Sequence, residues 1–150
     1  MTEINKLLDR YQQFYDEYFV HSPELYRKLS AEGQAPKTLV IACSDSRVDP
    51  SIIFKSEPGE LFVIRNVASL VPPFECDFVH CHGTSAAIEY AVRHLGVENI
   101  VVLGHSHCGG IKTLVDDHGH EHNFIDSWLS IADEAARERE NGADGYGDRG

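Results

Sequence analysis

Three short apolar runs stand out along the chain, at Thr38–Cys43, Leu61–Ile64 and Asn99–Leu103. Each run is too brief for a helix. Continuous apolar runs of about four to eight residues, bounded by turn signals, are typical of strands that are buried in a parallel sheet. The pattern therefore predicts three buried strands.

Apolar residues at helical spacing mark the other segments. The opening stretch groups Ile4, Leu7, Leu8, Tyr11, Tyr15, Tyr18 and Phe19 on one face. Ser22-Pro23-Glu24 predicts an N-cap with proline in the first turn, and Gly33 a C-cap. Further helices are expected over Thr84–Leu95, closed by Gly96, from near Gly109-Gly110-Ile111, and over Phe124–Glu140. Apolar strands that alternate with helices indicate an α/β fold, with a mostly parallel β-sheet flanked by helices and a protruding N-terminal helix.

The aromatic stripe of the opening helix has two interpretations. It packs either into the core of its own chain or against a second subunit, because a large apolar surface must be buried somewhere. The second interpretation predicts a homodimer or a higher homo-oligomer.

Length and charge narrow the class of protein. The 150 residues suit a single domain over 1–150, with N-terminal helices over 1–35, an α/β core over 36–140 and a glycine-rich, flexible tail over 141–150. Thirteen basic residues against twenty-four acidic ones give a net charge of −11. Nucleic acid and anionic membrane surfaces are therefore not expected as partners, since phosphate binding needs a basic face.

The cysteines point to a reducing compartment. Cys43, Cys76, Cys81 and Cys108 occur in a chain that starts without a basic segment followed by an apolar one, so we expect no secretory signal. No apolar run approaches the roughly 18 residues of a membrane span. We expect reduced thiols or metal ligands in a cytoplasmic protein.

Two loops carry the candidate chemistry, and each begins where a predicted strand ends. They are Cys43-Ser44-Asp45-Ser46-Arg47 and the segment from Gly104 to Gly110. Ligands of parallel sheets bind at the carboxyl ends of strands. Cys43, His105 and Cys108 would supply two thiolates and one imidazole, and three protein ligands with an open fourth position are typical of catalytic zinc. Thiolate sulfur favours zinc over magnesium or calcium.

Each of these residues also has an ordinary interpretation. The two cysteines suit buried core thiols, and His105 suits a hydrogen-bonded histidine at a strand end. His107 is a rival ligand, but His105 is preferred because it directly follows the strand. Asp45 has three interpretations: a fourth metal ligand, a group that Arg47 holds ionised and that orients the zinc-bound water, or one half of an ion pair that closes the loop. Its place beside Cys43 favours the orienting role.

Together, the C-x-D-x-R and H-x-x-C loops resemble the zinc signature of the β-class carbonic anhydrases. The segments Glu57–Asn66 and Ala87–Val92 are also similar, and the resemblance runs from about Glu24 to about Trp128. It is strongest to the plant-type and bacterial open-site branch. The resemblance implies a zinc lyase with one Zn²⁺ per chain, which interconverts carbon dioxide and bicarbonate by metal-hydroxide attack.

The resemblance also implies a role for individual residues. Cys43, His105 and Cys108 would bind zinc, and Asp45, held by Arg47, would orient the hydroxide. Carbon dioxide would contact the Gln34 amide and an apolar wall that is built partly by the neighbouring subunit, and His94 would relay protons. The residues that match the wall are Phe62, Val67 and Tyr90.

Two departures from the family pattern shape these expectations. Val40 stands where the branch with an allosteric bicarbonate site has tryptophan, although the Arg65 position is present. We therefore expect an open site, with Asp45 paired to Arg47 and not bound to zinc. The family's domain usually continues with another core strand and C-terminal helices. We expect this chain to lack them and to expose a sheet edge.

Two other clusters have metal-like composition. Cys76, His80, Cys81 and His82 are expected to form a loop of unpaired thiols, and His118, His120 and His122 a solvated loop with adventitious metal binding.

Two alternative functions stay open: hydrolysis of carbonyl sulfide or carbon disulfide at the same zinc site, and a non-catalytic zinc-binding assembly protein. The presence of Asp45 and Arg47 speaks against the non-catalytic alternative.

Overall fold

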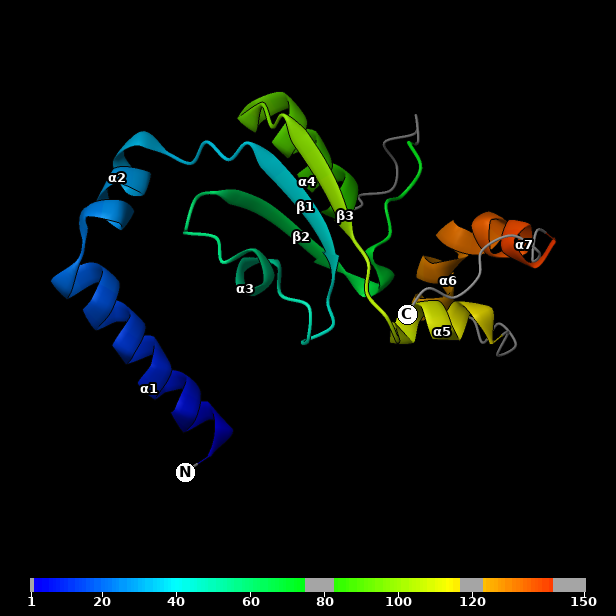
Figure 1. Ribbon diagram of the computed structural model, residues 1–150, viewed down its shortest axis with the longest axis horizontal. Helices are drawn as coiled ribbons and strands as arrows, with labels where there is room; N and C mark the ends of the chain where they lie inside the picture. Colours follow the sequence, from blue (N-terminus) through cyan, green and yellow to red (C-terminus); the bar gives the residue numbers. More distant parts are fainter. Residues whose placement is uncertain (1, 75–82, 117–122, 142–150) are drawn as a thin grey trace.

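A three-stranded parallel sheet lies at the centre of the computed structural model, which describes residues 2–74, 83–116 and 123–141 (Figure 1). Its strands are β1 (Thr38–Cys43), β2 (Leu61–Asn66) and β3 (Asn99–Leu103), in the order β2-β1-β3. Cys43 lies opposite Asn66, and Ala42 lies opposite Leu103. The carboxyl ends of all three strands are therefore level at one edge. The predicted positions of the three strands are confirmed, with β2 two residues longer than expected.

Helices surround this sheet and precede it. In chain order they are α1 (Glu3–Tyr15), the π-helical η1 (Asp16–His21), α2 (Glu24–Glu32), α3 (Pro50–Phe54), the 3-10 turn η2 (Val67–Ser69), α4 (Gly83–Tyr90), the π-helical η3 (Ala91–Leu95), α5 (Gly109–Val115), α6 (Phe124–Leu129), the 3-10 turn η4 (Ser130–Ala132) and α7 (Asp133–Asn141). Figure 1 shows α1 projecting away from the sheet, as the sequence predicted.

Three local predictions differ from the structure. The expected helix Phe124–Glu140 is interrupted by η4. Ser22 does not cap α2, because Pro23 is the N-cap and no side chain accepts a hydrogen bond there. The short helix α3 was missed, although Asp49 accepts a hydrogen bond from the Ser51 amide at 2.9 Å ahead of it and Pro50 occupies its first turn. Those two residues are the usual signal of a helix start.

The core has two parts, one at each end of β1. The first part is formed by Leu39, Ile41, Ile64 and Ala91, with Phe62, Ala87, Ile88 and Val97 packed against it. The second part lies at the carboxyl edge and is formed by Cys43, Ala68, Cys108 and Leu129, with Val48, Val67, Leu70, Leu114 and Trp128 around it. We call this second part the edge cluster. It places two of the predicted metal ligands inside a packed environment.

The predicted burial holds for β1, whereas β2 is mostly half-buried and the prediction that β3 is buried is wrong. Ile100 and Val102 are 52% and 55% exposed, although they pair in register with the buried Leu39 and Ile41. Both β2 and β3 are edge strands of the described sheet, so the physical reason lies in what covers each of them. The helical side chains of the first core part pack on β1 and β2 and leave β3 uncovered.

The aromatic stripe does not pack into the core of its own chain. No residue of α1 is buried, and Leu7 and Leu8 are each 58% exposed. Some of its rings contact each other, as in the stacked pair Tyr15 and Phe19, whose centroids lie 5.4 Å apart. The interpretation that required intramolecular burial is therefore wrong.

None of the helices in the described ranges has the length and apolarity to span a membrane.

The buried centre of β1 predicts a large loss of stability on truncation. Ile41→Ala should lower the free energy of unfolding by about 2–5 kcal/mol, because Ile41 is 1% exposed and a cavity would remain. Ile52→Ala is the matched control, since Ile52 in α3 is 76% exposed and its truncation leaves no cavity. Urea denaturation followed by circular dichroism measures both. Equal losses for the two variants would contradict this description of the core.

Candidate metal centre

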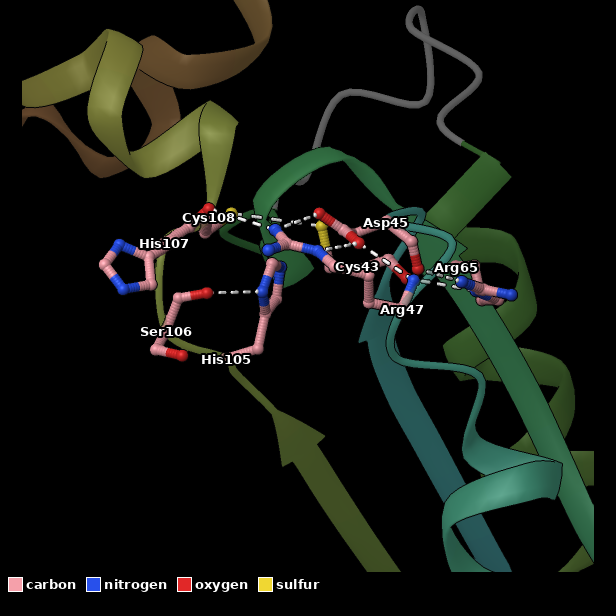
Figure 2. A network of polar contacts seen from close by, with 8 residues as sticks. All are labelled: Cys43, Asp45, Arg47, Arg65, His105, Ser106, His107 and Cys108. Atoms are coloured by element: carbon pink, nitrogen blue, oxygen red, sulfur yellow. Dashed lines mark hydrogen bonds and ion pairs between the residues drawn. The ribbon is translucent and has the colours of Figure 1, made fainter.

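Two loops meet at the carboxyl edge of the sheet (Figure 2). Cys43 is the last residue of β1, and the chain after β3 carries His105 and Cys108 before α5 begins. Since β1 and β3 are neighbours in the sheet, their ends bring distant parts of the chain together. One ligand atom each of Cys43, His105 and Cys108 lies within 4.8 Å of the others. Among the described residues, this is the group of three that the structure assembles with metal-binding spacing.

The donor atoms of this group fit a zinc ion. His105 Nε2 is buried and makes no hydrogen bond to any described residue. The other ring nitrogen, Nδ1, lies 2.9 Å from the carbonyl oxygen of Ser106 and donates its proton there, which leaves a lone pair on Nε2 for a metal. The two sulfur atoms are 3.9 Å apart and form no disulfide. Sulfur and imidazole nitrogen are the donors that zinc prefers.

The surroundings of Cys43 favour its thiolate form. Burial raises the pKa of the thiol, but the backbone N–H of Asp45, the His105 imidazole and the backbone N–H of Ala68 outweigh burial and lower the pKa to about 7. The neighbouring Cys43 in turn raises the pKa of His105. Because the thiolate is the form that binds metal, the lowered pKa of Cys43 favours the binding of a cation.

Asp45 and Arg47 form a two-point ion pair beside this group. Arg47 Nε donates to Asp45 Oδ1 at 2.9 Å, and Nη2 donates to Oδ2 at 2.7 Å. The Arg47 backbone N–H also donates to Oδ1 at 2.9 Å. These hydrogen bonds hold the pKa of Asp45 well below its usual range. Arg47 Nη2 also lies 3.2 Å from the carbonyl oxygen of His107, which links the two loops.

Arg65 contacts the first loop from β2, and the sequence reasoning assigned it no role in the site. Its Nε donates to the carbonyl oxygen of Cys43 at 3.0 Å, and its Nη2 donates to the carbonyl oxygen of Asp45 at 2.6 Å. Its Nη1 pairs with Asp49 Oδ2 at 2.9 Å. The register that sets Arg65 beside Ala42 places the guanidinium here. Pairing register was the missing information, because the chain alone does not show which residues face each other.

Of the predicted substrate residues, the structure brings only Val67 to the metal group, where it packs against the edge cluster. Phe62 and Tyr90 contact each other with ring centroids 5.9 Å apart, but Phe62 pairs with Leu39 near the start of β1. Leu39 precedes Cys43 by four positions along the strand, or about 13 Å.

Gln34 and His94 are also not brought to the metal group. Gln34 is exposed before β1 begins, and His94 is exposed with its ring against Tyr90 at 5.2 Å. The roles predicted for Gln34, His94, Phe62 and Tyr90 therefore stay predictions. A second subunit would have to bring these residues to the metal group. The clusters at Cys76, His80, Cys81 and His82 and at His118, His120 and His122 lie outside the described residues, as does the tail beyond Asn141.

Comparison with known proteins gives one consistent result. The family model for carbonic anhydrase matches residues 38–148. A curated relative, beta carbonic anhydrase 5, chloroplastic, of Arabidopsis thaliana, is 48% identical over 114 residues, which cover 75% of this chain and 36% of that protein. The chain thus spans about a third of this relative's length.

Solved structures agree with this match. The β-carbonic anhydrase CcaA has a TM-score of 0.84 at 37% identity, covering 97% of this chain and 70% of that one. A structure from the report of two tetrameric β-carbonic anhydrases of Sordaria macrospora has a TM-score of 0.80 at 35% identity, with the same coverage.

The two histidines of the second loop allow a matched test of the ligand set. His105→Asn should weaken zinc binding by roughly a hundredfold or more, because loss of an outer partner alone costs about 10–100-fold. His107→Asn should leave the affinity unchanged, since its ring is outside the ligand group and asparagine tolerates its positive φ of 54°. Competition with a zinc-binding dye measures both dissociation constants. A larger loss for His107→Asn would identify that residue as the ligand.

Proposed function

Because the chain belongs to the β-carbonic anhydrase family, we propose that it catalyses the reversible hydration of carbon dioxide to bicarbonate and a proton. The observation that carries the proposal is the Cys43–His105–Cys108 group beside the Asp45–Arg47 ion pair at one edge of the sheet. Cys43, His105 and Cys108 would hold one zinc ion. When bound, zinc acts as a Lewis acid that makes water a nucleophile near neutral pH.

Asp45 would direct this nucleophile. Its carboxylate is ionised at all physiological pH values, so it accepts hydrogen bonds and does not donate them. Arg47 donates a hydrogen bond to each oxygen of the Asp45 carboxylate, and these two bonds keep the carboxylate from rotating. A fixed acceptor beside the metal group orients the proton of a water molecule, and thereby turns the oxygen lone pair toward carbon dioxide.

The substrate would rest on apolar surface. Val67 and Ala68 line the metal group within one chain, and carbon dioxide, which carries no net dipole, is suited to such a wall. Phe62, Tyr90 and Gln34 would complete the wall from a neighbouring subunit, because their own chain places them far from its metal group. His94 would relay the product proton from the exposed side of η3.

The same reasoning supports a homodimer or higher homo-oligomer. The α1 stripe and the β3 residues Ile100 and Val102 are apolar and exposed, and exposed apolar surface of this extent marks an interaction site. The Sordaria relatives are described as tetrameric. We propose that a second copy of this chain covers the stripe and supplies the missing part of the substrate wall.

A cytoplasmic location is also part of the proposal. The unpaired Cys43 and Cys108 suit a reducing compartment. The Arabidopsis relative is chloroplastic, and fractionation of the source cells distinguishes the two locations.

Stopped-flow measurement of carbon dioxide hydration, on protein of known zinc content, tests the activity. We expect turnover at one zinc per chain, which rises with pH above neutrality because the nucleophile is deprotonated water, and which Cys43→Ala abolishes. A rate that falls across that pH range would contradict the mechanism. Zinc-loaded protein that hydrolyses carbonyl sulfide but does not hydrate carbon dioxide would establish the alternative substrate.

Asp45→Asn tests the orienting carboxylate separately from metal binding. The amide keeps the shape but removes the charge and one acceptor, so kcat should fall by about 10–100-fold while zinc content stays at one per chain. Asp9→Asn is the matched control, because Asp9 is an exposed carboxylate in α1. Loss of zinc together with activity would instead show that Asp45 supports the ligand set.

Charge placed on the α1 stripe tests the assembly. The double variant Leu8→Glu, Tyr11→Glu should shift the protein to monomers in size-exclusion chromatography with light scattering, because buried carboxylates lack partners in an apolar interface. Both positions are exposed within the chain, so the fold should persist. Arg10→Glu, on the polar side of the helix, should leave the assembly unchanged. An unshifted double variant would place the interface elsewhere.

A further inference from the structure

The turn η2 has a backbone conformation that needs support from its surroundings. Ala68 has φ 67° and Ser69 has φ 55°, in the left-handed region that residues other than glycine seldom adopt. Both residues are buried. Ser69 Oγ donates to the carbonyl oxygen of Leu103 at 2.9 Å, which connects the turn to the end of β3. Conformations of this kind persist where the neighbouring structure holds them in place.

The turn lies against the metal group. Ala68 belongs to the edge cluster together with Cys43 and Cys108. On the other side α5 begins so close that a Cβ atom on Gly110 would lie 2.8 Å from Val67 Cγ1 and 3.0 Å from Ala68 Cβ. A residue larger than glycine at position 110 would push the turn and the second loop apart. The position of η2 is thus coupled to both metal-binding loops.

Trp128 reaches this turn from α6. Its indole Nε1–H donates to the carbonyl oxygen of Val67 at 2.8 Å, across 61 residues of sequence. The next residue, Leu129, is 3% exposed within the edge cluster, which anchors α6 beside the turn. The Val67 carbonyl oxygen immediately precedes the left-handed residues. The indole therefore holds the backbone at the point where the unusual conformation begins.

We propose that Trp128 is a positioning residue for the metal centre: its indole N–H fixes the Val67–Ser69 turn, and the turn in turn fixes Cys43 relative to Cys108. The inference rests on the metal site of the proposed function but not on the substrate. Support comes from Ala68, which packs with both Cys43 and Cys108 in the edge cluster, so a shift of the turn would act directly on the two cysteines.

Two replacements of Trp128 separate positioning from simple packing. Trp128→Phe removes the N–H donor and part of the ring. Benzothienylalanine keeps the two-ring shape and replaces the N–H with sulfur, and biosynthetic incorporation is site-specific because the chain contains one tryptophan. Phe124→Leu is the matched control, since Phe124 lies on the same helix and is 96% exposed.

The readouts are the dissociation constants of the full chain for Zn²⁺ and Co²⁺ and the thiolate-to-cobalt absorption of the saturated protein. We expect both Trp128 replacements to raise the dissociation constants about tenfold and to shift the cobalt absorption, with unchanged far-ultraviolet circular dichroism. Phe124→Leu should match the wild type. If Trp128→Phe does not fold, the benzothienylalanine protein decides the question.

Wild-type affinity and an unchanged cobalt spectrum in the benzothienylalanine protein would overturn the inference. A weaker affinity with an unchanged spectrum at saturation would also overturn it, because the geometry of the ligands would then not depend on the indole. These results are independent of turnover. Normal metal binding without carbon dioxide hydration would contradict the proposed function alone, whereas a wild-type chain that binds no Co²⁺ would contradict both.

Discussion

The parallel alignment of β1 with β3 is the constraint on which the metal centre depends. β1 lies between the other two strands, and its register with β3 places Ala42 opposite Leu103, so that the residues after both strands leave the sheet at the same level. Cys43 and the His105–Cys108 loop are then adjacent, and the contact of Arg47 with the His107 carbonyl oxygen links the two loops. Because β1 is buried along nearly its whole length, the stability of the sheet and the position of Cys43 have the same physical origin.

Arginine side chains make this edge rigid in a chain whose net charge is −11. Arg65 bonds the Cys43 and Asp45 carbonyl oxygens and pairs with Asp49, while Arg47 holds the Asp45 carboxylate and the second loop. Charge-assisted hydrogen bonds with two contact points restrict orientation as well as distance. The positive charge of Arg47 beside Asp45 keeps this carboxylate ionised. Acidic residues elsewhere on the surface do not alter this, since exposed charges are screened over roughly 8–10 Å at physiological salt.

One chain supplies the metal group but only part of the proposed substrate wall. Val67 lies at the group, whereas Phe62 and Tyr90 pack together near the opposite end of the sheet. The same chain exposes apolar side chains on α1 and β3. Both observations have a common explanation if a second copy covers these surfaces and brings its own Phe62 and Tyr90 to the metal group. Assembly and substrate binding would then depend on the same apolar contacts.

The sequence by itself determined the strands, most of the helices and the three candidate ligands, because apolar runs, Gly33 and Gly96 at helix ends, and the C-x-D-x-R and H-x-x-C spacings are local properties of the chain. It did not show that Arg65 clamps the first loop, that β3 is exposed, or that Trp128 bonds the Val67 carbonyl. Those features depend on strand register, on which faces the helices cover, and on contacts between residues far apart in the chain. Only tertiary structure decides them, since hydrogen-bond partners and burial are properties of packed surfaces, which a local pattern does not specify.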